Sequence, residues 1–277
     1  MENADYHAHP AISKSHLDLI ARSPMHYWAR YLDPKRVAPE PTAAMLLGSA
    51  LHTHVLELDK WDREYAVAPD GIDRRTKAGK EAWAAFEAES ADRTVLSRSD
   101  ADLVMHMGRS ILTHPAAAML LGMDGEAETT HMWTDATTGL QCKCRPDWIS
   151  VDGGILVDLK TTEDASPREF QRSIAKWRYH VQAGWYMAGI EASYGKRPSG
   201  FIFIAVEKKP PFAVGVYAAD EEMINRGYEI AMRDLQKLAE CKAADQWPAY
   251  SHRIEPISLP AWMTGANATQ TTEIETY

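Results

Sequence analysis

The chain has 277 residues, of which 45% are hydrophobic and 25% charged, and this composition excludes a disordered or fibrous protein and indicates a globular one. The net charge of −9 argues against a protein that coats nucleic acid non-specifically, but it does not exclude an enzyme that holds DNA in a local basic channel. No apolar run approaches the roughly 18 residues that span a bilayer, and no signal peptide is visible, so we expect a cytoplasmic protein without a membrane segment.

Two short helices are predicted near the start of the chain. Ser13 or Ser15 can cap the first helix, and the pair Ser23-Pro24 ends it and begins the second. Because the N-terminus of a helix can bind a phosphate, Arg22 and Ser23 are candidates for a DNA contact. A capping serine beside a surface arginine is the more common meaning of such a pair.

A stronger helix is predicted over residues 42–58, where apolar side chains recur at helical spacing. Gly48 and His52 lie one turn apart on it. A glycine there lets another backbone come close, and His52 can reach a site beside the helix. Taken alone, such a histidine is more often packed in the core or exposed at the surface.

A basic segment follows at residues 69–80, which we expect to be a mobile loop. Its cations could clamp the phosphates of DNA, or they could be a solvated charge cluster. Helices are predicted over residues 81–89 and 99–121, the second broken near His114-Pro115. The candidate DNA-binding cations of the loop are Arg74, Arg75, Lys77 and Lys80.

After these helices the pattern becomes alternating, which is typical of strands. Residues 126–133 and 140–149 predict a β-hairpin, and residues 155–160 a third strand that follows a second turn at Asp152-Gly153-Gly154. A long helix is predicted next. Two more strands, a further helix and a polar, disordered tail complete the chain. The long helix is predicted over residues 167–191, the two strands over 201–206 and 212–217, the further helix over 220–241 and the tail over 264–277.

Two carboxylates fall on successive predicted strands. Asp158 follows Asp147 by eleven residues, and Lys160 stands two places beyond Asp158, which puts both side chains on one face of a strand. Two acids close together repel unless a cation or a proton separates them, and Mg²⁺ or Mn²⁺ prefers such oxygen ligands. The lysine could then position an attacking water. Because Asp-x-Lys alone occurs often by chance, further residues are needed to support a site.

Other candidates flank this pair. Glu128 opens the first predicted strand of the hairpin and could face the same metal, although Glu126 competes for this role. Gln182 and Tyr186 lie one turn apart on the predicted long helix, so their polar ends share a face. The cysteines are too few for a disulfide framework or a four-cysteine iron–sulfur cluster, so free thiols are expected at Cys142, Cys144 and Cys241.

Taken together in chain order, these motifs resemble those of the RecB-like branch of the PD-(D/E)xK nucleases. Any one of them would be weak evidence by itself. Residues 13–17, 23–27 and 139–147 make the chain similar to the RecE-type exonucleases, the nuclease domain of exonuclease VIII. The resemblance covers about residues 9–245. The motifs that carry it are Gly48-x-x-x-His52, Glu128, Asp147, Asp158-x-Lys160 and Gln182-x-x-x-Tyr186.

The resemblance implies an α/β (α+β) fold of the restriction-endonuclease type, with a mixed central sheet flanked by helices. Residues 122–245 would form this core. Residues 1–121 would be a helical N-terminal part that contributes Gly48 and His52, and residues 246–277 an irregular tail.

The resemblance also implies the chemistry. Mg²⁺, for which Mn²⁺ can substitute, would be held by His52, Glu128, Asp147, Asp158 and the main-chain carbonyl of Leu159. Lys160 would activate or position the water, and Gln182 and Tyr186 would support Lys160 and the DNA strand.

The implied activity is a 5′→3′ exonuclease that degrades linear double-stranded DNA to mononucleotides and leaves a 3′ overhang. Such enzymes form toroidal homo-oligomers, here a trimer or a tetramer, and work with a single-strand annealing protein in phage-type recombination. The alternatives are an endonuclease or single-strand-specific nuclease of the same fold, or a non-catalytic DNA-binding module.

Overall fold

The computed structural model describes residues 1–37, 39–251 and 253–259, and its centre is a five-stranded mixed sheet. The strand order is β3-β6-β7-β8-β9. β7 and β8 are parallel, and the other neighbouring strands are antiparallel. A parallel pair needs a crossover connection, which α9 and α10 supply. The strands are β3 (Gly125–Ala127), β6 (Trp148–Ser150), β7 (Ile155–Thr162), β8 (Gly200–Glu207) and β9 (Val214–Ala218).

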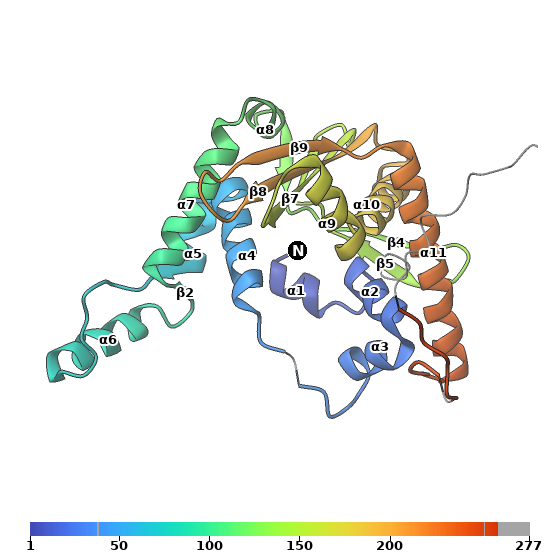
Figure 1. Cartoon of the computed structure of the whole chain (residues 1–277), viewed down its shortest axis with the longest axis horizontal. Helices are drawn as coiled ribbons and strands as arrows, with labels where there is room; N and C mark the ends of the chain where they lie inside the picture. Colours follow the sequence, from blue (N-terminus) through green and yellow to red (C-terminus); the bar gives the residue numbers. More distant parts are fainter. Residues whose placement is uncertain (38, 252, 260–277) are drawn as a thin grey trace, which may run out of the picture.

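Alternate residues of the central strands enter two different buried clusters, one on each face of the sheet. Leu156 and Phe203 belong to one cluster, whereas Val157, Leu159 and Ile204 belong to the other. Figure 1 shows the helices of the two clusters on opposite sides of the strands. The first cluster takes in α2 (Lys14–Arg22), α3 (Pro24–Tyr31), α9 (Pro167–Trp177), α10 (Tyr179–Tyr194) and α11 (Glu221–Ala244), and the second α4 (Ala43–Leu56), α7 (Arg98–Thr113) and α8 (Pro115–Leu121).

The remaining elements are short or lie outside the central sheet. β4 and β5 form a separate hairpin, and β1 and β2 form a small parallel pair. In Figure 1, α6 stands away from the rest of the molecule. These elements are α1 (Asn3–Ala8), η1 (Leu58–Lys60), α5 (Trp61–Glu64), β1 (Tyr65–Val67), α6 (Lys77–Glu89), β2 (Thr94–Leu96), β4 (His131–Thr134) and β5 (Gln141–Cys144).

The predicted mixed sheet flanked by helices is confirmed. The division after residues 121 and 245 stays a prediction, and the predicted tail at 264–277 lies outside the described residues. The three cysteines are free and buried, as expected. Within the described part of the chain, no helix has both the length and the apolar character that a membrane crossing requires.

The long helix predicted over 167–191 is wrong, because α9 and α10 meet at a break. Arg178 between them adopts a left-handed conformation, with φ +57°. This conformation costs a non-glycine residue about 1–2 kcal/mol. Ion pairs of its guanidinium with Asp18 (3.1 Å) and with the buried Asp234 offset that cost.

The two strands predicted for the hairpin are each divided. After β3 the chain leaves the sheet at Glu128, whose φ is +52°, and resumes as β4. The segment Arg145-Pro146-Asp147 separates β5 from β6. Because proline has no N–H for a strand ladder, Pro146 favours the interruption. Only β4 and β5 pair as the predicted hairpin, and β3 pairs with β6 in the central sheet.

The basic segment is less of a loop than predicted. α6 begins at Lys77 and not at Glu81, so Lys77 and Lys80 are helical. Thr76 caps this helix by accepting a hydrogen bond from the N–H of Gly79. A Cβ at residue 79 would lie 2.0 Å from the carbonyl oxygen of Asp73, so this turn requires glycine.

Candidate active site

β6 and β7 bring the two strand acids together. Trp148 pairs with Val157, so the same antiparallel register places Asp147 opposite Asp158. Both residues are buried. The Asp147 Oδ2 accepts a hydrogen bond from the main-chain N–H of Leu159, with 2.6 Å between the two atoms. The acids are therefore fixed by the sheet itself and not by flexible loops.

His52, Glu128 and Asp147 form the cluster that can hold a metal ion, with one ligand atom from each lying within 4.8 Å of the others. His52 comes from α4. Its Nδ1 lies 3.5 Å from Glu128 Oε1 and 3.6 Å from Asp147 Oδ1. Its Nε2 lies 3.2 Å from the carbonyl oxygen of Leu159, which can only accept a hydrogen bond, so Nε2 carries the proton.

The charge of His52 follows from these neighbours. Burial lowers the pKa of the imidazole, but the carboxylates of Asp147 and Glu128 outweigh burial and raise the pKa to about 9. At neutral pH the metal-free protein therefore carries an imidazolium between two carboxylates. The positive charge of the imidazolium reduces the repulsion between the carboxylates of Asp147 and Glu128.

Asp158 has different partners. Its Oδ1 contacts the ammonium of Lys160, and its Oδ2 accepts a hydrogen bond from the side-chain amide of Gln182. Burial and the nearby Asp147 raise the pKa of Asp158 to about 6, against the opposing effect of Lys160. Asp158 is not among the three residues of the 4.8 Å cluster.

Lys160 remains charged although it is surrounded by protein. Burial lowers its pKa, but the negative charges of Asp158 and Asp147 outweigh burial and hold the pKa above its ordinary value. Its Nζ also lies 4.8 Å from the centre of the Tyr179 ring, a cation–π distance. Tyr179 opens α10, and the sequence analysis did not identify it because only the break at Arg178 places it there.

The donor set fits a divalent cation. Two carboxylates and an imidazole converge, and oxygen with nitrogen ligands suits Mg²⁺ or Mn²⁺. The buried Oδ1 of Asp158 is already paired with the ammonium of Lys160. A cation held by His52, Glu128 and Asp147 would take the place of the proton on the imidazole of His52. The carbonyl oxygen of Leu159 faces the same imidazole.

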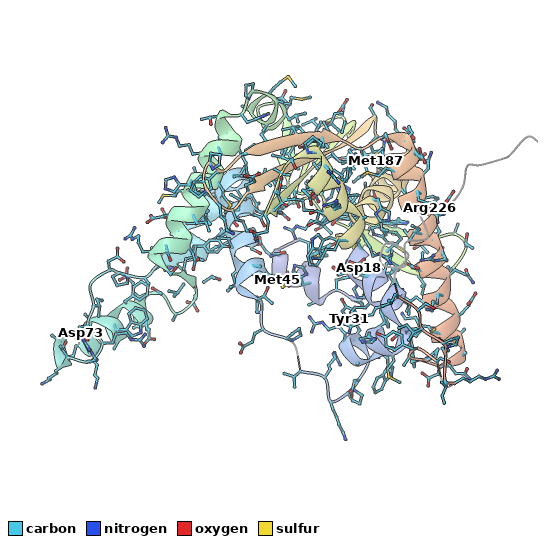
Figure 2. The ribbon with its side chains drawn as sticks, viewed as in Figure 1. Asp18, Tyr31, Met45, Asp73, Met187 and Arg226 are labelled. Carbon is cyan, nitrogen blue, oxygen red and sulfur yellow. The ribbon has the colours of Figure 1, made fainter. Side chains whose placement is uncertain are left out.

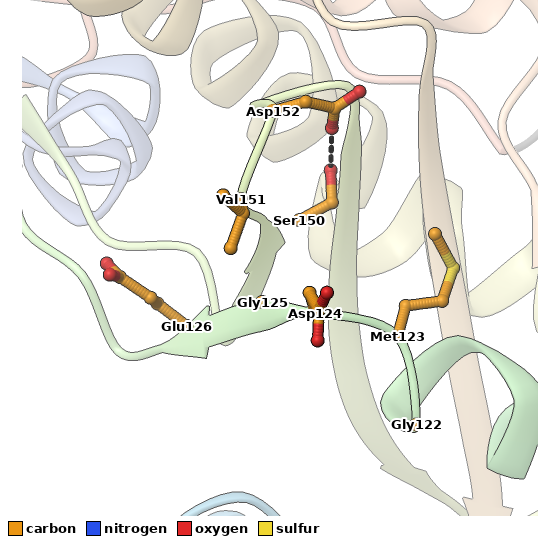
Figure 3. A pocket seen from close by; sticks show the side chains of 8 residues that line it. All are labelled: Gly122, Met123, Asp124, Gly125, Glu126, Ser150, Val151 and Asp152. Atoms are coloured by element: carbon orange, nitrogen blue, oxygen red, sulfur yellow. Dashed lines mark hydrogen bonds between the residues drawn. The ribbon is translucent and has the colours of Figure 1, made fainter.

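Glu128, and not Glu126, belongs to this cluster. Glu128 does not open a strand as predicted but occupies the left-handed turn after β3, where its N–H donates to the Asp147 carbonyl oxygen (3.0 Å). Backbone strain of this kind is often found at functional sites. Glu126 instead lines a separate open pocket of about 840 Å³ with Asp124 and Asp152 (Figure 3).

Arg145 is a second residue that the sequence analysis missed. Its Nε donates to Glu128 Oε2 at 2.9 Å, and another guanidinium nitrogen donates to the Met1 carbonyl oxygen at 3.2 Å. Lys143, two residues earlier, is buried and donates to the carbonyl oxygens of Tyr6 and His9. The signal was two cations at strand spacing before Asp147, but their partners in the N-terminal segment could not be read from the spacing.

Gln182 and Tyr186 share a face of α10, as the spacing predicted. Gln182 contacts Asp158 directly. Tyr186 is half-buried, and its ring lies 6.3 Å from that of Phe201. Burial raises its pKa well above the ordinary value, and Tyr6 and the acids of the site add to this. Tyr186 is therefore a neutral phenol beside the acids.

The candidate DNA contacts lie outside the acid cluster. Ser23 is buried, accepts a hydrogen bond from the N–H of His26 and contacts His26 Nδ1 at 2.6 Å, so its hydroxyl is engaged as a helix cap. Arg22 is exposed. The basic residues near α6 lie on the segment that stands apart in Figure 2, where Asp73 marks its outer end. There Arg75 pairs with Asp73 (2.8 Å), Arg74 packs on Trp83 (4.2 Å), Lys77 faces Glu81 (3.9 Å) and Lys80 is exposed.

Comparison with solved structures supports the fold. A crystal structure of a provisionally named exonuclease from Eubacterium rectale aligns with a TM-score of 0.64 at 14% identity, over 97% of this chain and 98% of that one. A phage related exonuclease from Haemophilus somnus aligns over 64% of this chain and 91% of that one, at 11% identity, with a TM-score of only 0.35. At these identities the first likeness shows the fold alone, and the second carries no argument. The comparison with curated proteins gives no match.

The family of the chain follows from a direct match. A family model described as a PDDEXK-like domain of unknown function (DUF3799) matches residues 13–260, which is most of the chain. The match includes every residue of the acid cluster, Lys160 and the helix that carries Gln182. PD-(D/E)xK nucleases use divalent metals, in agreement with the cluster found at His52. The chain therefore belongs to the DUF3799 family of PDDEXK-like domains, within the PD-(D/E)xK nuclease superfamily.

Proposed function

We propose that this protein is a Mg²⁺-dependent exonuclease that degrades linear double-stranded DNA in the 5′→3′ direction and releases mononucleotides. The observation that carries the proposal is the cluster of His52, Glu128 and Asp147, which the Leu159 N–H to Asp147 hydrogen bond joins to the strand that carries the Asp158–Lys160 pair. The resemblance to the RecE-type exonucleases supports the direction and the substrate. A toroidal trimer or tetramer and a single-strand annealing partner are parts of the same proposal.

Phosphodiester hydrolysis needs an in-line water, neutralisation of the charge that develops on the phosphate, and a stabilised leaving oxygen. When bound, the divalent metal supplies the charge neutralisation and lowers the pKa of water. Asp147, Glu128 and His52 would hold it. Lys160, fixed between Asp158 and the Tyr179 ring, presents a positive charge that orients the water and offsets charge on the phosphate.

The proposal is tested by degradation assays on matched DNA substrates with Mg²⁺, with Mn²⁺ and with a chelator. Linear duplexes labelled at the 5′ or the 3′ end, with a 5′-phosphate or a 5′-hydroxyl, are compared with nicked and closed circular DNA. We expect metal-dependent release of 5′-labelled mononucleotides from linear DNA and no cutting of closed circles. Cutting of closed circles would indicate an endonuclease, and no cleavage of any substrate would indicate a binding module.

Lys160→Ala is the variant that tests the mechanism. We expect it to lose activity on linear DNA, and its folding is checked by urea unfolding because the variant leaves the buried Asp158 without its cation. Lys196→Ala, which removes an exposed lysine after α10, is the matched control and should retain activity. Full activity of Lys160→Ala would show that the role assigned to this lysine is wrong.

A further inference from the structure

A groove of about 750 Å³ is lined in part by the last residues of β7. Its lining includes Thr161 and Thr162, which follow Lys160 in the strand. It also includes Tyr179, whose ring makes a cation–π contact with the Lys160 ammonium. One wall is the N-terminal end of α4 and the other is α9. Tyr179 therefore lines the groove and also contacts the lysine that would position the attacking water.

The groove exposes two large apolar side chains. Trp177, the last residue of α9, is 54% exposed, and Met45, near the start of α4 (Figure 2), is 61% exposed. The Nζ of Lys14 donates to the carbonyl oxygen of Trp177 at 2.9 Å, which anchors the backbone that carries the indole. An anchored, exposed aromatic ring beside a catalytic centre is suited to stacking against a flat ligand.

Almost all the charged side chains that line the groove have an ion-pair or hydrogen-bond partner. Arg172 pairs with Glu169 (2.6 Å), and Lys208 pairs with Glu163 (2.5 Å). The carboxylate of Asp164 accepts a hydrogen bond from the N–H of Ser166 (2.7 Å). These groups comprise three carboxylates and two cations, so without Lys176 the groove does not select anions.

Lys176 is the exception. Its Nζ lies 4.7 Å from the centre of the Trp177 ring, and among the described residues no carboxylate lies within 4 Å of it. An indole face with one uncompensated cation beside it matches a single nucleotide unit, which combines a flat base with one phosphate charge.

We propose that this groove binds the single strand next to the bond being cut, with a nucleobase stacked on Trp177 and the adjoining phosphate beside Lys176. The inference rests on the proposed nuclease function and adds a substrate-binding site to it. Stacking on an indole is tolerant of sequence, because every base has a π face. The site would therefore let the enzyme hold strands of any sequence as it degrades them.

The test is equilibrium binding of a fluorescent single-stranded oligonucleotide to the full chain in a chelator, followed by anisotropy. We expect Trp177→Ala to weaken binding by roughly 5- to 100-fold, and Trp177→Phe to weaken it far less, because phenylalanine can still stack. Lys176→Gln should reduce the slope of log affinity against log salt by about 0.7, the value for one phosphate of a single strand. Tyr228→Ala and Lys237→Gln, exposed residues of α11, are the matched controls and should bind as the unmodified protein does.

A second measurement does not depend on a variant. An oligonucleotide that contains 5-iododeoxyuridine is cross-linked to the unmodified protein by light, and the attached peptide is identified by mass spectrometry. Cross-links at Trp177 are expected, and cross-links confined to other segments would overturn the inference.

The failure of the inference can be separated from the failure of the proposed function. If the protein degrades linear DNA while Trp177→Ala binds the oligonucleotide and has the same KM as the unmodified protein, the groove is not the strand site and the nuclease function stands. If the unmodified protein neither binds nor degrades DNA, both proposals are wrong. If the inference is right, the KM of Trp177→Ala for linear DNA rises more than its kcat falls, because stacking holds substrate and transition state alike.

Discussion

The two carboxylate oxygens of Asp147 have different partners. Oδ2 accepts a hydrogen bond from the Leu159 N–H at 2.6 Å, and Oδ1 lies 3.6 Å from His52 Nδ1. The first contact joins the start of β6 to the middle of β7. The second contributes to the cluster that can hold a metal. Substitutions of Asp147 can therefore separate its contribution to the stability of the fold from its contribution to metal binding.

Asp147→Asn and Asp147→Ala should differ in stability but not in activity. Asparagine keeps an oxygen that can accept the Leu159 N–H, whereas alanine leaves this buried donor unpaired, at a cost of about 1–3 kcal/mol. Urea unfolding in a chelator should therefore find Asp147→Ala less stable than Asp147→Asn by that amount. Cleavage should fall by about 100-fold or more in both variants, because both lose the charge that faces the metal position. Equal unfolding free energies would contradict the structural role of Oδ2.

Arg145 should act on the metal through Glu128. Arg145→Gln removes the 2.9 Å hydrogen bond to Glu128 Oε2, so this carboxylate is no longer held in place. We expect the affinity for Mn²⁺ or Mg²⁺, measured by calorimetry, to fall by about 10- to 100-fold. Activity should recover in part when the metal concentration is raised, which a general loss of folding would not allow.

The control for this position is Arg93→Gln. Arg93 also donates to main-chain carbonyl oxygens, those of Asp62 and Glu89, but it has no contact with the acid cluster. Its metal affinity should be unchanged. An equal loss in both variants would show that Arg145 does not position Glu128.

Metal binding should release a proton from His52. The pKa of about 9 means that the imidazole is protonated through the neutral range, and a metal can bind Nδ1 only after this proton leaves. The apparent metal affinity should therefore rise by up to about tenfold per pH unit between pH 7 and 9 and level off above pH 9. The stability of the metal-free protein should change in the opposite direction as the pH rises. The stability that the imidazolium adds is complete below pH 6.5 and is lost as the pH rises through 9.

Calorimetry in two buffers of different ionisation enthalpy measures this proton release. Asp158, with a pKa of about 6, releases its own proton below the range from pH 7 to 9. His52→Gln should bind metal more weakly and with little dependence on pH. A strong pH dependence that persists in His52→Gln would contradict the assignment.

Strand alternation was sufficient to predict which acids and which lysine share a face. Asp158 and Lys160 are two residues apart in one strand, and Asp147 lies opposite Asp158 by the register of an adjacent strand. These relationships are local or nearly so, and they depend on a period of two that the sequence displays directly. The helix that carries His52 was equally visible, because its apolar spacing is regular and Thr42 caps it.

The breaks in the elements could not be predicted in the same way. Arg178 ends α9 without a glycine or a proline to signal it, because its conformation is maintained by Asp18 and Asp234, which are distant in the sequence. The left-handed Glu128 has no local signal either. Tyr179 and Arg145 were missed for this reason, since their contacts exist only after distant segments pack.

His16 should make the protein less stable in mild acid. Its Nδ1 lies 3.1 Å from the main-chain nitrogen of Ser13, which can only donate, so Nδ1 must be unprotonated, and the ring stacks on Tyr31 at 4.0 Å. Burial, together with the positive charges of Lys143 and nearby cations, lowers its pKa to about 3. The unfolded chain binds this proton below pH 6.5 but the folded chain does not until about pH 3, so stability is lost as the pH falls between these values, by up to about 1.4 kcal/mol per pH unit.

Urea unfolding at a series of pH values from 7 downward, compared with His16→Gln, measures this loss. Glutamine can accept the Ser13 N–H through its side-chain oxygen but does not titrate. The difference in unfolding free energy between the two proteins should therefore change steadily in favour of His16→Gln as the pH falls below 6.5. Comparing the two proteins cancels the other titrating groups, including Asp158, whose raised pKa acts in the opposite direction. Parallel pH profiles would show that His16 titrates alike in the folded and unfolded chains and that the Ser13 contact does not hold it neutral.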